Sequence, residues 1–288
     1  MKNHPEQKKA VLMLADGTRF EGLATGTTGG EICFNTGMTG YQEIYTDPSY
    51  YGQIVVNTNS HIGNYGTADS ETESKDVKIR GLVVRNFSDT YSRHTAQNSL
   101  QKYLSKANII GIANIDTRRL VRHIRNTGAI NALISSESLD DETLKKELAK
   151  IPKMEGLELA SKVSTTKIRY EGDEKNAKFR VAVLDIGIKN SILSNFVERG
   201  CYCKVFPART TYEELKAWNP DGFFISNGPG DPASMDYAIK TVKAIIADDK
   251  PLFGICLGHQ VLALSMGIST YKMHHGHRGL NHPVKNLE

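Results

Sequence analysis

The sequence predicts an α/β protein with two parts, a mixed β/α domain followed by a doubly wound, mostly parallel sheet. Strand-like segments dominate the first part, whereas strands and helices alternate regularly after residue 178. Regular alternation is typical of a parallel sheet covered by helices on both faces. A polar stretch without clear periodicity separates the two patterns. We therefore predict domains at residues 1–152 and 178–288, joined by a linker at 153–177 that has room for a strand or a short helix.

The first domain opens with a β-hairpin, because strand-like runs at residues 10–15 and 18–24 flank the turn dipeptide Asp16-Gly17. The remaining elements of this domain are expected as strands at residues 31–35, 53–57, 81–85, 109–113 and 129–135, and as helices at residues 98–106, 117–126 and 140–150.

The helix at residues 117–126 has a basic face. Asp116 is placed to cap it and Gly128 to end it. Its apolar residues share one side, and four arginines line the rest, namely Arg118, Arg119, Arg122 and Arg125. Such a face is usually solvated, and a docking surface for a partner is the alternative.

A long polar loop is predicted at residues 36–50. It is rich in Gly, Thr and Tyr, and Asp47-Pro48-Ser49 has the chemistry of a turn. Loops of this length are uncommon in compact domains unless they are functional. We therefore keep two interpretations of this loop, a functional segment and a solvated connection. His61, in a further polar turn, is interpreted as structural.

The second domain is expected to contain strands at residues 179–184, 201–206, 222–226, 252–255 and 268–272, and helices at residues 190–199, 211–217, 235–247 and 257–266. Ligands of such sheets bind beyond the carboxyl ends of the strands. The loops there with unusual chemistry are residues 185–187, residues 226–232 and the turn at Cys256.

Cys256 lies in the pattern G-x-C-x-G-x-Q, which has the form of a nucleophile elbow between a strand and a helix. At Gly254 and Gly258 a side chain would block close packing of that strand and helix. The unpaired N–H groups and the dipole at the helix start favour a thiolate, which is a nucleophile suited to acyl transfer. A buried core cysteine is the alternative, and the flanking glycines argue against it.

The loop at residues 227–232 lacks the Gly-Lys-Ser/Thr of a phosphate-binding loop. Its glycines, Gly228 and Gly230, allow backbone N–H groups to turn toward a cavity. An oxyanion beside Cys256 needs such donors, and the N–H of Leu257 is a natural second donor. A plain tight turn is the alternative.

A thiol nucleophile also needs a general base, normally a histidine oriented by a carboxylate. His259 lies on the same helix and is interpreted as a packing or surface residue. No metal site is expected from the late histidines, because they lack nearby Cys, Asp or Glu ligands; they are His274, His275, His277 and His282.

The composition narrows the function classes. The chain has 39% hydrophobic residues and a net charge of +4 with both signs interspersed, so neither a nucleic-acid nor a membrane protein is expected. No apolar segment resembles a secretory signal. The scattered cysteines, including Cys201 and Cys203 in one strand-like run, resemble neither a disulfide framework nor a zinc site. We expect a cytoplasmic protein.

Taken together, the motifs resemble a known family. The elbow and the glycine loop are similar to class I (triad) glutamine amidotransferases, whose domain is flavodoxin-like. The upstream motifs resemble the small subunit of glutamine-dependent carbamoyl-phosphate synthetase; they comprise residues 34–44, 46–50, 61–64, 114–118 and 276–284. The resemblance covers residues 11–284.

The resemblance implies hydrolysis of glutamine through a thioester on Cys256. By position in the motifs, it implies that Gly228 and Leu257 form the oxyanion hole. It further implies glutamine contacts from Gly230, Gln260 and, across the domains, Ser49. Ammonia would pass to a large subunit that holds ATP and Mg and makes carbamoyl phosphate for arginine and pyrimidine biosynthesis; no cofactor is expected in this chain.

The family's catalytic His and Glu follow its His-Pro-Val motif, and residues that match them are not found before Glu288. We therefore expect an amidotransferase domain incomplete at its C-terminus, with little or no glutaminase activity in the 288-residue chain. Two alternatives stand beside the enzyme subunit. One is a non-catalytic docking subunit, and the other is a different cysteine hydrolase with His259 or His275 as its base.

Overall fold

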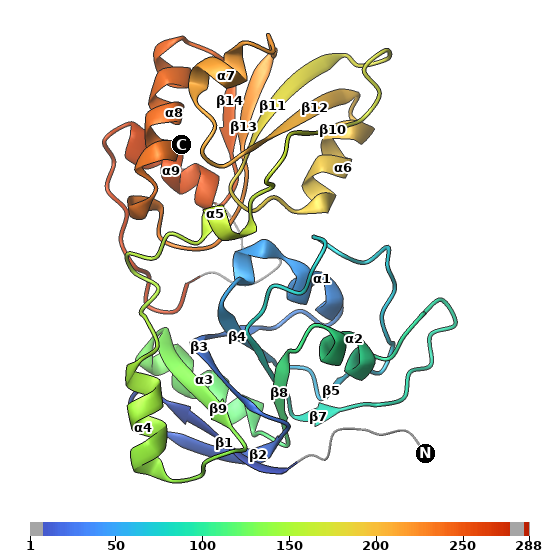
Figure 1. Cartoon of the computed structure of the whole chain (residues 1–288), viewed down its shortest axis with the longest axis vertical. Helices are drawn as coiled ribbons and strands as arrows, with labels where there is room; N and C mark the ends of the chain where they lie inside the picture. The colour runs from blue at the N-terminus through green and yellow to red at the C-terminus, as the bar shows by residue number, and fades with distance from the viewer. Residues whose placement is uncertain (1–7, 277–284, 288) are drawn as a thin grey trace.

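The computed structural model describes residues 8–276 and 285–287 and consists of two halves, one above the other (Figure 1). The lower half is built around a closed barrel of seven strands in the order β1-β2-β8-β6-β4-β3-β9. The strands from β3 through β4 and β6 to β8 run parallel, and the other neighbours are antiparallel. The mixed β/α character predicted from the sequence is confirmed.

The elements of this half follow in chain order: β1 (Lys8–Leu14), β2 (Arg19–Ala24), β3 (Thr27–Asn35), α1 (Tyr41–Thr46), the 3₁₀ helix η1 (Pro48–Tyr50), β4 (Gln53–Asn57), β5 (His61–Ile62), β6 (Gly81–Val83), β7 (Asn86–Phe87), α2 (Leu100–Lys106), β8 (Ile110–Ala113), α3 (Thr117–Thr127), β9 (Ile130–Ser135) and α4 (Asp141–Ala149).

Apolar side chains fill the barrel and extend to the helices around it. Leu12, Ile54 and Ile134 lie in one buried cluster with Leu120 and Ile124 of α3. Separate buried clusters lie under α1 and α2 and under α4. Helix α3 begins at Asp116 and ends at Gly128 as predicted, and its four arginines are exposed. Docking of a partner on this basic face stays a prediction.

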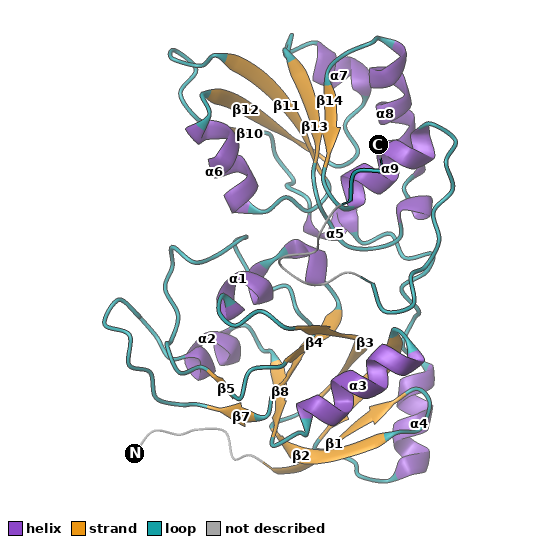
Figure 2. Cartoon of the chain, turned by 180° about the vertical axis from the view of Figure 1, so that it is seen from behind, coloured by secondary structure: helices purple, strands orange, loops and turns teal. Residues whose placement is uncertain are grey.

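The upper half is a five-stranded sheet in the order β10-β12-β11-β13-β14, parallel except for β10. Helix α6 covers one face, and α7, α8 and α9 cover the other (Figure 2). The doubly wound sheet is therefore confirmed. Its elements are α5 (Ala160–Val163), β10 (Arg169–Glu171), β11 (Phe179–Asp185), α6 (Asn190–Glu198), β12 (Cys201–Pro207), α7 (Tyr212–Lys216), β13 (Gly222–Ile225), η2 (Pro232–Ser234), α8 (Asp236–Ala247), β14 (Leu252–Gly254) and α9 (Leu257–Ser265).

The predicted loop at residues 36–50 is in part a helix. Tyr41, Ile44 and Tyr45 recur at helical spacing and are buried on one side of α1. Asp47 then caps η1 by accepting a hydrogen bond from the N–H of Ser49. The many Gly and Thr residues before α1 hid this short periodic segment.

The strand predicted at residues 268–272 is not formed. This segment instead leaves the upper half and runs to the barrel, where Lys272 Nζ lies 2.6 Å from Glu31 Oε2. The carbonyl oxygen of His274 then accepts a hydrogen bond from the N–H of Ala129 at 2.7 Å. Lys272 and His274 thus bond to the barrel, and β14 has β13 as its neighbour in the described sheet. No local sequence pattern encodes these contacts with the barrel.

The predicted linker contains α5 and β10, and β10 pairs with β12 at the edge of the upper sheet. Within the described ranges, no helix has both the length and the apolar character needed to cross a membrane.

Candidate functional site

The site is assembled where β11, β13 and β14 end, because parallel strands present their carboxyl ends at one edge of the sheet. Three loops meet there, residues 185–190, residues 226–232 and the turn at Cys256. Buried Asp185 orders the first loop, and its Oδ1 accepts hydrogen bonds from the N–H groups of Gly187 and Ile188 at 2.9 and 2.8 Å.

Cys256 forms the sharp turn from β14 into α9, and it is exposed. Its backbone has φ 52° and ψ −111°, a conformation that residues other than glycine rarely adopt. The turn presents the thiol at the N-terminus of a nine-residue helix, where the helix dipole stabilises negative charge. This is the geometry of the predicted nucleophile elbow.

Close packing behind the elbow accounts for one of its glycines. A Cβ atom on Gly258 would overlap the carbonyl oxygen of Ile225 at the end of β13. Helix α9 therefore approaches the strand more closely than any side chain permits, which fixes Cys256 at the edge of the sheet. Buried Leu257 and Val261 belong to the core on this face of the sheet.

Gly228 and Leu257, predicted as oxyanion donors, are brought together. A Cβ atom on Gly228 would lie 3.1 Å from Leu257 Cδ2 and would overlap the carbonyl oxygen of Ile186. Only glycine fits here, so the loop places its bare backbone directly beside the residue that follows the nucleophile.

Gly230 lies in the loop after β13, and Gln260 lies in α9, four residues after Cys256. Gly230 has a φ of 99°, and the next residue, Asp231, donates its N–H to the carbonyl oxygen of Leu157 at 2.9 Å. Gln260 is exposed on the first turn of α9 and donates its N–H to the carbonyl oxygen of Cys256 at 3.1 Å. Contact of these two residues with glutamine stays a prediction.

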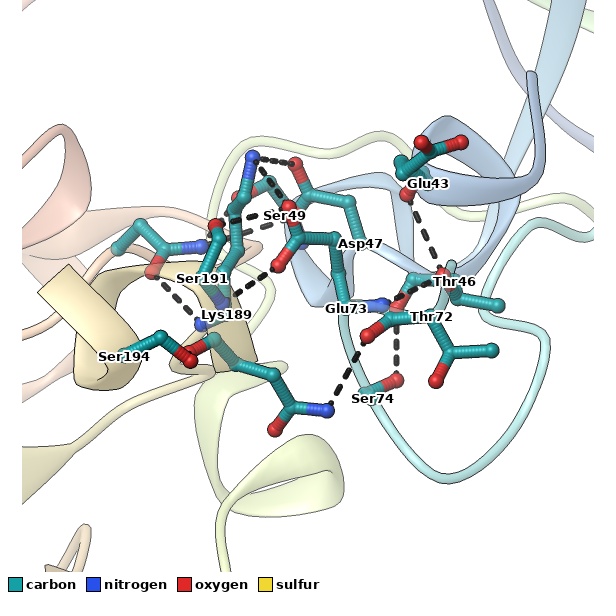
Figure 3. Close-up of polar contacts among 12 residues, drawn as sticks. Glu43, Thr46, Asp47, Ser49, Thr72, Glu73, Ser74, Lys189, Ser191 and Ser194 are labelled. Atoms are coloured by element: carbon teal, nitrogen blue, oxygen red, sulfur yellow. Dashed lines mark hydrogen bonds and ion pairs between the residues drawn. The ribbon is translucent and has the colours of Figure 1, made fainter. Parts of the chain in front are cut away.

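Ser49 reaches the site from the other half of the molecule. Asn227, buried in the glycine loop, donates from Nδ2 to Ser49 Oγ at 3.0 Å (Figure 3). The sequence placed Ser49 here only by resemblance, and Asn227 was missed as the residue that joins the halves.

Charged residues around this contact were also missed. Lys189 Nζ lies 3.8 Å from Asp47 Oδ2 and 3.3 Å from Glu73 Oε1 (Figure 3). Burial raises the pKa of the Asp47 carboxyl, and the Lys189 ammonium opposes that shift. The turn Asp47-Pro48-Ser49 was the available sequence signal, whereas Glu73 lies in a loop without a motif.

The histidines considered as bases or ligands are dispersed. His259 is exposed on α9, and His275 stacks on Phe34 of the barrel with ring centroids 6.1 Å apart. His277 and His282 lie outside the described residues. In the part of the chain that the structure describes, no three His, Cys, Asp or Glu side chains form a group suited to a metal ion.

Comparisons with known proteins match both halves. A family model for the carbamoyl-phosphate synthase small chain, CPSase domain, matches residues 12–134, and one for glutamine amidotransferase class-I matches residues 182–288. The chain is 48% identical over 283 residues to the carbamoyl phosphate synthase small chain of Chlorobaculum tepidum, covering 96% of this chain and 77% of that relative.

Two further relatives with the same name give similar values. The protein of Yersinia pseudotuberculosis is 48% identical over 300 residues, covering 98% of this chain and 76% of the relative. The protein of Escherichia coli (strain K12) is 46% identical over 299 residues, covering 98% of this chain and 78% of the relative. The chain thus spans about three quarters of the length of these relatives.

Proposed function

The chain belongs to the family of carbamoyl-phosphate synthase small chains, and from this membership we infer that it is a glutaminase subunit acting through Cys256. The observation that supports the role of Cys256 is its position, at a positive φ, in the sharp turn at the start of α9. Such an elbow has no evident purpose in a subunit that only docks, so the non-catalytic alternative is not favoured.

In the proposed reaction, the Cys256 thiolate attacks the side-chain carboxamide carbon of glutamine. The C–O π electrons move to oxygen, and the backbone N–H groups of Leu257 and Gly228 stabilise the resulting oxyanion. The C–O double bond then reforms as the C–N bond breaks, the nitrogen takes a proton from water and leaves as ammonia, and a thioester remains on Cys256. Water hydrolyses the thioester to glutamate and restores the thiol.

Glutamine is proposed to bind along the line from Cys256 to the other half of the molecule. Gln260 lies one helical turn after the nucleophile, Gly230 lies in the glycine loop, and Ser49 extends from the barrel toward the same loop through its hydrogen bond with Asn227. A substrate with a polar head group benefits from such converging hydrogen-bonding groups.

The partner is proposed to be a large subunit that receives ammonia and combines it with bicarbonate, using ATP and Mg that it binds itself. The two chains would form a heterodimer whose carbamoyl phosphate supplies arginine and pyrimidine biosynthesis. Neither a cofactor nor a metal is proposed for this chain, and a cytoplasmic location stays a prediction.

A glutamine-analogue alkylator tests the assignment. We expect a single covalent adduct on Cys256, located by peptide mass spectrometry, and we expect glutamine to slow its formation. Labelling at another residue, or labelling that glutamine does not slow, would contradict the proposed nucleophile.

A further inference from the structure

Helix α6 of the upper half is capped by a residue of the lower half. Lys189, the residue before α6, makes no side-chain cap of its own. Glu73 Oε2 instead accepts a hydrogen bond from the N–H of Ser191 at 2.9 Å, and its Oε1 accepts one from Ser191 Oγ at 2.8 Å (Figure 3). The carbonyl oxygen of Glu73 also accepts the N–H of Asn190 at 2.9 Å.

Electrostatics strengthen this cap. The N-terminus of a helix attracts negative charge, and Lys189 Nζ lies 3.3 Å from Glu73 Oε1. Glu73 is only 7% exposed, so solvent screens these interactions little. A carboxylate buried between two domains would be costly without such partners.

The cap is tied to the segment that carries Ser49. The N–H of Glu73 donates to Thr46 Oγ1 at 2.9 Å, and Ser74 Oγ donates to the carbonyl oxygen of Thr46 at 2.6 Å. Thr46 ends α1, and Asp47, which follows it, caps the 3₁₀ helix that contains Ser49. A short chain of contacts therefore runs from α6 through Glu73 to Ser49.

We propose that Glu73 is a positioning residue for the glutamine pocket. By capping α6 from across the interface, it fixes α1 and η1 against the upper sheet and thereby holds Ser49 in reach of Asn227. This role rests on the proposed function, because Ser49 matters only if the pocket takes glutamine. Glu73 touches neither the substrate nor Cys256.

The test compares two alkylators of Cys256 in the product of the whole reading frame with its partner subunit. A glutamine-analogue alkylator requires the pocket, whereas iodoacetamide requires only the thiol. For Glu73→Ala we expect the half-saturating concentration of the analogue to rise about tenfold, as loss of a charged cap and its ion pair implies. The rate at which iodoacetamide alkylates Cys256 should stay within about twofold of that of the unaltered protein, since the turn at Cys256 is untouched.

The half-saturating concentration for Glu73→Gln should lie between those of the unaltered protein and Glu73→Ala, because the Gln amide oxygen can still accept the N–H of Ser191. The matched control is Glu71→Ala. Glu71 lies in the same loop and pairs with Arg93 at 2.5 Å within the lower half, so its removal should leave analogue saturation unchanged. Hydrogen exchange at residues 47–51 and 190–192 should accelerate in Glu73→Ala and not in Glu71→Ala.

Ser49→Ala completes a double-mutant cycle. If Glu73 acts through Ser49, the combined variant should saturate no worse than Ser49→Ala alone. Additive losses, unchanged saturation in Glu73→Ala, or an equal loss of iodoacetamide reactivity would overturn the proposal. If the unaltered protein shows no glutamine-protected labelling of Cys256, the proposed function fails first, and the role of Glu73 falls with it.

Discussion

The strained turn at Cys256 predicts an unusual order of stability for two inactive variants. Cys256→Ala and Cys256→Gly both remove the thiol, so both should lose glutamine-analogue labelling. They differ in the backbone, because at φ 52° and ψ −111° alanine keeps the steric strain of cysteine and glycine relieves it. We therefore expect Cys256→Gly to be the more stable of the two.

The magnitude follows from two opposing terms. Strain at such a residue costs about 1–3 kcal/mol, and the greater freedom of glycine in the unfolded chain costs about 0.4–1 kcal/mol. The difference favours Cys256→Gly over Cys256→Ala by about 1 kcal/mol in the free energy of unfolding. At Gln260, on the helical first turn of α9, the same comparison should reverse, with glycine less stable by about 1 kcal/mol.

Tryptophan fluorescence during urea unfolding measures this difference in the relevant half. Trp218 is the only tryptophan of the chain and packs on the core shared by the sheet and α9. A Cys256→Gly variant that is no more stable than Cys256→Ala, while the Gln260 pair behaves as expected, would refute the claim that the elbow stores backbone strain.

Further predictions concern thiols, pH and the oxyanion site. Burial raises the pKa of Cys203 to about 12, so brief iodoacetamide treatment at about pH 8 should label Cys256 and spare Cys203, as peptide mapping can verify. The raised pKa of Asp47 means that its protonation stabilises the fold below pH 3.8, a contribution lost as the pH rises through the raised value. The stability of the unaltered protein relative to Asp47→Asn, measured by urea unfolding, should therefore fall from about pH 4 to about pH 7; a rise would contradict the shift. In Gly228→Ala the new methyl overlaps the carbonyl oxygen of Ile186, so the loop must move, and labelling by the glutamine analogue should slow by about 10²–10³-fold. A rate near that of the unaltered protein would remove Gly228 from the oxyanion site.

Local patterns encoded much of the upper half. Strand and helix periods predicted the doubly wound sheet, and the spacing of Gly254, Cys256 and Gly258 predicted the elbow, because each depends on neighbours in sequence. The caps of α3 and α7 were encoded equally locally, by Asp116 and by Thr211.

The contacts between the halves could not be read in this way. Ser49 and Asn227 are 178 positions apart, and Glu73 and Ser191 are 118 apart. Neither pair has a periodic signature, since each residue is a plain polar side chain until the fold brings its partner near. The same holds for Lys272, whose partner Glu31 lies in the barrel. Ser49 was predicted from the family resemblance, whereas the roles of Asn227, Glu73 and Lys272 were found only in the structure.

Within residues 8–276, the chain crosses between the two halves at about residues 152–156 and again at about residues 268–272, and both crossings lie on the same side of the molecule (Figure 1). These crossings are covalent, whereas Asn227 with Ser49 and Ser191 with Glu73 join the same halves by hydrogen bonds alone. Separation of the halves would therefore break the hydrogen bond between Ser49 and Asn227 while the covalent crossings remain intact. The position of Ser49 beside the loop at residues 226–232 thus depends on side-chain contacts between the halves, and the covalent connections alone do not secure it.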